Sequence, residues 1–138
     1  MTIQVYPFAF AIMNTYQQAQ TGTRILELSE FYRRLPFGSW LRNQFLRKTI
    51  PLSKTLDFRV VNLLPGRCVA QLKEQNRLQN EHYCVHESAI AALAEHTARL
   101  AMLTGLATES SATLTGWSIQ YQKAGHGLLT AECQSPLP

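Results

Sequence analysis

The chain has 138 residues, of which 46% are hydrophobic and 16% are charged, and its formal net charge is +4. This length suits one domain with a buried core, and the composition excludes a disordered chain. The low share of charged residues also predicts that a partner subunit covers some apolar surface, so we expect a homodimer. Three cysteines, Cys68, Cys84 and Cys133, lack close pairing and CxxC spacing. They predict buried free thiols in a reducing, cytoplasmic compartment rather than a disulfide framework.

Much of the positive charge lies early in the chain, at Arg24, Arg33, Arg34, Arg42, Arg47 and Lys48. Such a bias attracts nucleic acid, an anionic membrane surface or a phosphate-bearing small molecule, and charge alone does not choose among them. Because no nucleic-acid-binding motif accompanies it, we interpret it as a solvated helix face and expect neither a nucleic-acid nor a membrane partner. Contact of these basic helices with a membrane or nucleic acid is the weaker alternative.

Residues 1–23 are predicted to be an N-terminal extension, and residues 24–138 the domain itself. Residues 1–13 (MTIQVYPFAFAIM) are apolar, but they carry no basic segment and are too short to span a bilayer, which argues against a signal peptide. A polar run over residues 14–23 marks the expected boundary.

Two short amphipathic helices are predicted between residues 23 and 50, because apolar residues recur at helical spacing on both sides of Pro36 and Gly38. The segments LDFRVVNLL (56–64) and RCVAQLKE (67–74) then alternate around Pro65-Gly66, which predicts a β-hairpin. Residues 86–104 form the strongest predicted helix. Residues 112–125 and 126–135 are interpreted as two further strands joined around Gly125-His126-Gly127, with His126 as a turn residue. This order indicates an α+β layout.

The long predicted helix carries an acidic residue, Glu95, in the middle of an apolar and alanine-rich segment. At 100° per residue, Ile90, Leu93, Ala94, Thr97 and Ala101 share the face expected to contact a sheet, and Glu95 falls on the opposite face. An ion pair of Glu95 with Arg99, one turn later, is the simplest explanation of this carboxylate.

The start of this helix suggests a second role for the carboxylate. His86 stands at the predicted start, so the backbone N–H groups of Glu87 and Ser88 are expected to be unpaired donors at the positive end of the helix dipole. Such donors can hold a carbonyl oxygen or an oxyanion. A polarised carbonyl together with a carboxylate further along the helix favours attack of water on an acyl group.

The run Asn80-x5-His86, followed by Ala89 and Ala92-Leu93-Ala94-Glu95, resembles the N-x5-H-G-G-x4-L-A-D/E signature of hotdog-fold acyl-CoA thioesterases of the phenylacetate-pathway type. The segments LLPGRCVAQLKEQNRLQN and LTGWSIQYQKAGHGLLTAE resemble the strands that flank this motif. The likeness covers about residues 24 to 134, and it is greatest to a bacterial branch that carries Glu in place of Asp on the helix.

This resemblance implies a hotdog fold, in which an antiparallel sheet wraps around a long central helix, and a dimer, or a tetramer, with the site at the subunit boundary. The substrate would be an acyl-CoA thioester. Glu95 matches the carboxylate that activates water or attacks directly, and Asn80 and His86 match the loop residues that position it or the thioester. The N–H of Glu87, with that of Ser88 beside it, matches the oxyanion donor. Candidate substrate-binding residues are Arg77, Lys123 and Tyr121.

Two departures from the pattern leave alternatives open. Glu87-Ser88 replaces the glycine pair of the signature, so a non-catalytic acyl-thioester-binding or structural hotdog dimer is the alternative function. The chain also stops at Pro138, soon after the last predicted strand, where hotdog domains usually add one or two more. Either the sheet is short, or the strand-like segment IQVYPFAFAIM fills the vacancy, or the sequence is truncated.

Metal and cofactor chemistry is not predicted. His82, His86 and His96 lie near Glu87 and Glu95, yet the spacing gives no HExxH and no cysteine pair. Ser88 is not a nucleophile elbow, because no GxSxG surrounds it.

Overall fold

The computed structural model describes residues 1–5, 9–13, 16–106 and 111–135, and its centre is a four-stranded sheet with the order β1-β6-β4-β3. The strands are β1 (Thr2–Val5), β3 (Arg59–Leu64), β4 (Arg67–Lys73) and β6 (Leu128–Gln134). β3 and β6 both pair antiparallel with β4, whereas β1 runs parallel to β6. The expected antiparallel sheet is therefore found in three of the four strands.

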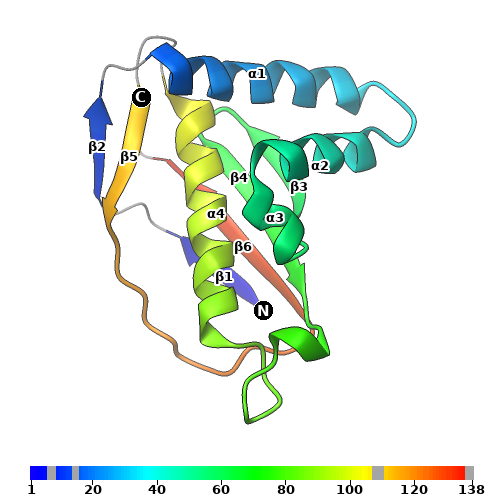
Figure 1. Cartoon of the computed structure of the whole chain (residues 1–138), viewed down its shortest axis with the longest axis vertical. Coiled ribbons are helices and arrows are strands. Elements are labelled where there is room, and N and C mark those ends of the chain that lie inside the picture. Colours follow the sequence, from blue (N-terminus) through cyan, green and yellow to red (C-terminus); the bar gives the residue numbers. More distant parts are fainter. Residues whose placement is uncertain (6–8, 14–15, 107–110, 136–138) are drawn as a thin grey trace.

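A separate two-stranded sheet is formed by β2 (Ala9–Met13) and β5 (Ser111–Gly116), which pair antiparallel. Together with β1, it shows that the strand-like N-terminal segment contributes a strand to each sheet, one packed against the long helix and one beside it (Figure 1). This is one of the three arrangements that the sequence left open. A sequence pattern marks a strand but does not name its neighbour, so this choice needed the structure.

The helices are α1 (Tyr16–Arg33), α2 (Gly38–Thr49), α3 (Pro51–Thr55), the 3₁₀ turn η1 (Asn76–Leu78) and α4 (Glu87–Gly105). Figure 1 shows α4 lying along one face of the sheet, with α1 crossing its C-terminal end and α2 and α3 beside β3. α1 begins before Thr23, so it is continuous across the expected domain boundary. No helix in the described part of the chain is long and apolar enough to cross a bilayer.

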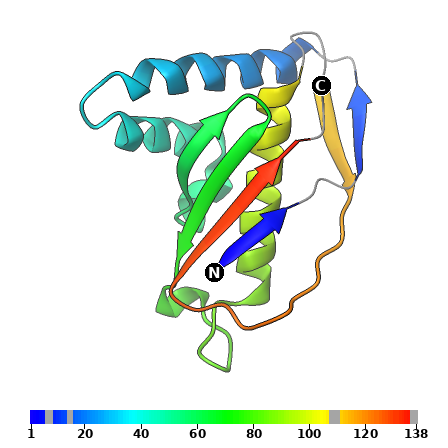
Figure 2. The same ribbon diagram turned by 180° about the vertical axis from the view of Figure 1, so that it is seen from behind.

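The core lies between α4 and the sheet, because alternate strand residues face the helix. The side chains of Cys68, Ala70 and Leu72 on β4 are buried. They form one core with the buried residues of the neighbouring strand β6 and of the helix α4. No helix of the described residues covers the other face of the sheet (Figure 2), and polar pairs occupy it, such as Arg67 with Glu132 at 2.5 Å. This one-sided burial explains the alternation seen in the sequence.

The expected α+β layout, the first hairpin and the long helix are confirmed: β3 and β4 turn at Pro65-Gly66, and α4 spans Glu87–Gly105. All five residues of the predicted sheet-facing side of α4, namely Ile90, Leu93, Ala94, Thr97 and Ala101, are buried. The opposite face is covered only in its later part, where Ala98 and Met102 are buried.

The second predicted hairpin is wrong. β5 ends at Gly116 and pairs with β2, whereas β6 lies between β1 and β4. Residues 117–127 instead form a long connection beneath the N-terminal end of α4 (Figures 1 and 2). The Val85 N–H donates to the Gly125 carbonyl at 2.9 Å, so the backbone of this connection bonds to the loop before α4 rather than to β5.

Candidate active site

The start of α4 is capped by the side chain of His86. The Nδ1 atom of this side chain accepts a hydrogen bond from the Ser88 N–H at 3.1 Å. The backbone N–H of His86 donates to the Leu78 carbonyl at 2.7 Å. The Glu87 N–H has no hydrogen-bond partner within the described residues. One unpaired donor therefore stands at the positive end of the helix, and the Ser88 N–H, expected to be unpaired, is already bonded to the imidazole.

Asn80 orders the loop that leads to this helix start. Its Oδ1 accepts from the N–H groups of His82 at 2.9 Å and Cys84 at 3.2 Å. Its Nδ2 donates to Glu87 Oε1 at 3.2 Å, which ties the loop to the helix. Tyr83 takes a left-handed conformation (φ 58°), rare for a residue with a side chain, to close this turn. Asn80 thus holds both the loop and the Glu87 carboxylate.

A pocket of about 330 Å³ opens beside the helix start. Its lining brings together three predicted site residues, His86, Ser88 and Arg77. The guanidinium of Arg77 donates to the Thr55 carbonyl at 2.7 Å and to Gln75 Oε1 at 2.8 Å, which fixes a positive charge at the pocket. The remaining lining residues are Leu56, Leu78, Gln79 and Ala89. Leu56, just after α3, and Gln79, just after η1, were not predicted as site residues, since only the folded chain brings them to one place.

Glu95 lies apart from these groups in the same chain. Its Oε1 accepts from Arg99 Nη2 at 2.7 Å, and its side chain is 34% exposed. The ion pair that the sequence offered as the simplest explanation therefore forms. Glu95 comes eight positions after Glu87 in the helix. At a rise of 1.5 Å per residue, the two lie about 12 Å apart along the helix axis. The structure does not bring Glu95 to the pocket of its own chain.

Tyr121 reaches the helix start from the 117–127 connection, where its hydroxyl donates to the Glu87 carbonyl at 3.1 Å. Its ring is 46% exposed. Lys123 is exposed two residues further along the same connection. The predicted substrate-binding residues therefore come from two sides: Arg77 from η1, and Tyr121 and Lys123 from this connection.

His96 differs from its neighbour Glu95 because it points into the core. It is 4% exposed, and its ring stacks on Phe58 with 5.0 Å between the centroids. Burial, with a smaller effect of the Arg99 charge, lowers the pKa of His96 to about 4. The imidazole is thus neutral near pH 7. No group of three His, Cys, Asp or Glu side chains that could bind a metal occurs within the described residues.

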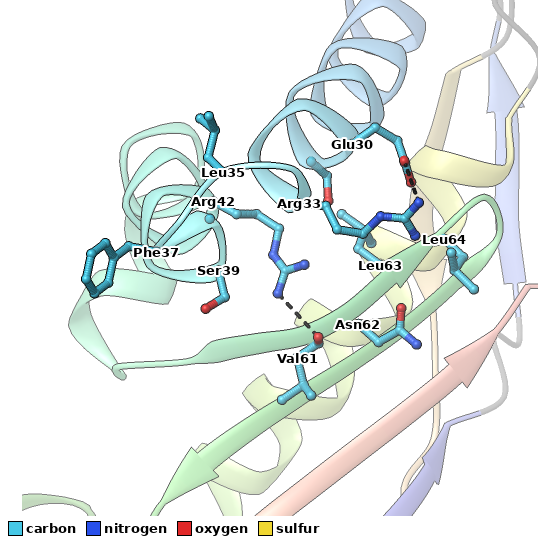
Figure 3. Close-up of a pocket in the computed structure, with 12 residues that line it drawn as sticks. Glu30, Arg33, Leu35, Phe37, Ser39, Arg42, Val61, Asn62, Leu63 and Leu64 are labelled. Carbon is cyan, nitrogen blue, oxygen red and sulfur yellow. Dashed lines mark hydrogen bonds and ion pairs between the residues drawn. The ribbon is translucent and has the colours of Figure 1, made fainter.

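A second pocket, of about 410 Å³, lies between α1, α2 and β3 (Figure 3). Its cationic side chains already have partners: Arg33 pairs with Glu30 at 3.1 Å, and Arg42 donates to the Val60 carbonyl at 2.6 Å and the Val61 carbonyl at 3.3 Å. Arg42, together with Asn43, covers part of the open edge of β3. We therefore place the candidate site at the start of α4.

A sheet packed along one long helix, with a capped helix start that opens on a pocket, defines a hotdog-type domain. The chain belongs to the family described as Domain of unknown function (DUF4442), which matches residues 38–137.

Two solved structures share the hotdog fold. One is a crystal structure from a genomics project, with a TM-score of 0.66 and 15% identity over 78% of this chain and 71% of that chain. The other is the E. coli PaaI protein from the phenylacetic acid degradation operon, with a TM-score of 0.56 and 18% identity over 70% of this chain and 69% of that chain. No curated protein matches this chain. The expected superfamily is confirmed at the level of the fold.

Proposed function

We propose that this protein hydrolyses an acyl-CoA thioester at a site shared between two subunits, with Glu95 as general base or nucleophile. The observation that carries the proposal is the unpaired Glu87 N–H at the start of α4, next to the pocket lined by His86, Ser88 and Ala89. A backbone donor at the positive end of a helix stabilises the negative charge that develops on a thioester carbonyl oxygen during attack.

The need for a second subunit follows from the length of the helix. A carboxylate about 12 Å along the axis from Glu87 cannot act on a carbonyl bound at the Glu87 N–H of its own chain. In the proposed homodimer, Glu95 of one chain faces the helix start of the other. The part of α4 around Ala91, Ala92 and Glu95 is only partly covered, so a second chain would be able to approach it closely.

The pair with Arg99 leaves the carboxylate able to act. Only Oε1 is bonded to Arg99, and Oε2 has no hydrogen-bond partner within the described residues. An Oε2 that faces a bound thioester can accept a proton from water or attack the carbonyl carbon directly. The ion pair then fixes the side-chain rotamer of the base.

The positive charges around the pocket suit a coenzyme A thioester. Arg77, fixed by two hydrogen bonds, and the exposed Lys123 would meet the nucleotide phosphates. Tyr121 lies against the Glu87 carbonyl and would contact the arm that carries the acyl group. Asn80 and His86 would position the helix start through the contacts described above.

A non-catalytic acyl-thioester-binding dimer is the second candidate function. It is favoured by the helix start itself, where the Ser88 N–H is occupied by His86 and the Glu87 carboxylate lies 3.2 Å from Asn80 Nδ2. A negative charge beside the oxyanion position opposes the charge that forms during hydrolysis.

Release of free CoA thiol from acetyl-, hexanoyl- and phenylacetyl-CoA separates these two functions. The wild type is expected to turn over at least one of them, and Glu95→Gln to lose roughly 10²–10⁴-fold in kcat. Arg99→Gln is the matched control, because it removes the same ion pair but keeps the carboxylate. It should retain activity, and its free energy of unfolding should fall by only about 0.5 kcal/mol. Binding without hydrolysis by the wild type would favour the binding dimer, and equal losses in both variants would assign the effect to the ion pair.

A further inference from the structure

Outside the proposed site, three side chains from separate segments meet at the base of α4. Cys84 Sγ lies 3.4 Å from His126 Nε2, and His126 Nδ1 lies 4.0 Å from Glu74 Oε2. A thiol, an imidazole and a carboxylate in this order form an arrangement in which a base can take the proton of a nucleophile while the charge of a nearby carboxylate favours the protonated base.

The backbone holds these three segments together. The Val85 N–H donates to the Gly125 carbonyl at 2.9 Å. Cys84 and His126 are the chain neighbours of these two residues, so this hydrogen bond holds them close together. The Glu74 N–H donates to the Gly127 carbonyl at 2.8 Å, and the Gly127 N–H donates back to Glu74 Oε2 at 2.6 Å. Gly125 packs on Ile90, where an added Cβ would lie 3.0 Å from Ile90 Cδ1. The geometry is therefore built by the fold rather than by chance contact of surface side chains.

The carboxylate is in the state that this arrangement needs. Hydrogen bonds from the Gly127 N–H and then from the Gln79 side chain, at 2.8 Å, lower the pKa of Glu74, and His126 adds to this effect. An ionised carboxylate near Nδ1 favours the tautomer that carries its proton on Nδ1, which leaves Nε2 free to accept a proton from the Cys84 thiol.

Cys84 also differs from the other two cysteines. Cys68 and Cys133 are fully buried side by side on β4 and β6, and burial raises the pKa of Cys133 to about 11 and that of Cys68 further still. Cys84 is also buried, with 9% exposure, but it lies in a loop, and its imidazole partner is largely exposed. The thiolate is the nucleophilic form of cysteine, so the thiol with a base beside it is the reactive one of the three.

We propose that Cys84 is a nucleophilic thiol that accepts the acyl group of a thioester, with His126 as its base and Glu74 as a positioning residue. This inference rests on the proposed function for its substrate class. Cys84 Sγ forms a bond to the acyl carbon, and the bond from that carbon to the sulfur of CoA breaks. The Cys84 proton passes to His126 Nε2 and then to the departing CoA thiolate, so the products are S-acyl-Cys84 and CoA, with no oxidation or reduction. Cys84 precedes the helix cap by two residues, and Gln79 links Glu74 to the helix-start pocket.

The test incubates the full chain with hexanoyl-CoA and isotopically labelled free CoA. Because acyl transfer to a thiol is reversible, Cys84 should move label into hexanoyl-CoA even when the adduct is short-lived. Intact mass and peptide mapping should show one hexanoyl group on Cys84. Cys84→Ser should abolish both signals, and His126→Gln should slow exchange about 10²-fold.

Glu74→Gln should lower the maximal exchange rate and leave the KM for hexanoyl-CoA unchanged, a split that a purely structural role does not produce. Cys68 and Cys133 are internal controls and should stay unmodified. The proposal is overturned if the wild type exchanges label no faster than Cys84→Ser, or if His126→Gln has no effect. If CoA release depends on Glu95 but Cys84 exchanges no label, the role given to Cys84 is overturned and the proposed hydrolysis stands. If Cys84 exchanges label but no net hydrolysis occurs, the proposed hydrolysis is overturned and the role given to Cys84 stands.

Discussion

Two adjacent residues of α4 carry ionisable side chains in opposite surroundings. Glu95 lies on the outer face in an ion pair with Arg99, whereas His96 is enclosed and stacked on Phe58. His96 Nε2 is buried without a hydrogen-bond partner in the described part of the structure. Such a group lowers stability when charged, so His96 makes folding sensitive to acid.

The direction of this pH dependence follows from the two pKa values. Burial holds the pKa of His96 near 4 in the folded chain, against its ordinary 6.5, so between these values only the unfolded chain takes up the proton. The free energy of unfolding should therefore fall by about 3 kcal/mol as the pH drops from 6.5 to 4, and be unaffected by this group above 6.5. Urea unfolding at about pH 5 and about pH 7 measures it.

His96→Leu is the control for this prediction, because it fills a similar volume without an ionisable group. Its free energy of unfolding should lose most of the dependence on pH in this range. An unchanged slope in His96→Leu would show that another group is responsible.

At the residue scale, spacing in the sequence predicted the helix start and the direction of Glu95, because both follow from helical periodicity. It also predicted that Cys84 is a buried free thiol, which is confirmed, and it interpreted His126 as a turn residue. Their contact joins positions 42 residues apart. No local pattern reports such a pair, since it depends on how two loops pack.

At the element scale, the corner between α1 and α2 depends on Gly38. A Cβ at this position would lie 1.6 Å from the Tyr32 carbonyl oxygen, which is backbone and cannot rotate away. Gly38→Ala should therefore destabilise the chain by about 3 kcal/mol through overpacking. Gly116→Ala is the matched control, because a Cβ there meets nothing within 4 Å. Thermal unfolding of the two variants compares them, and equal midpoints would contradict the role given to Gly38.

The elements differ in how far the sequence determined them. The hairpin of β3 and β4 was predictable, because a Pro-Gly turn joins two alternating strands and fixes their register. β5 and β6 also alternate, but β5 pairs with β2 and β6 pairs with β1 and β4, all of them distant in sequence. Alternation predicts a strand and its buried face but not its neighbour, and this is why the second hairpin was wrong.

At the scale of the whole molecule, a single chain does not bring the proposed catalytic groups together. The helix start, with its pocket, and Glu95 lie too far apart to act on one thioester within one chain. An isologous dimer would bring each helix start to the Glu95 of the other chain and form two equal sites. The composition predicted a partner from the low share of charged residues, and the length of α4 would give such a partner a chemical role in the proposed hydrolysis.

Complementation between two inactive variants tests this shared site most directly. Glu95→Gln removes the base, and Ser88→Trp fills the helix-start pocket from an exposed position. Each variant alone should be inactive towards the acyl-CoA that the wild type hydrolyses. Co-expressed in equal amounts, they should recover about one quarter of wild-type activity, because half of the dimers would be mixed and each would hold one intact site. A mixture no more active than the separate variants, with mixed dimers shown by mass spectrometry, would contradict the shared site.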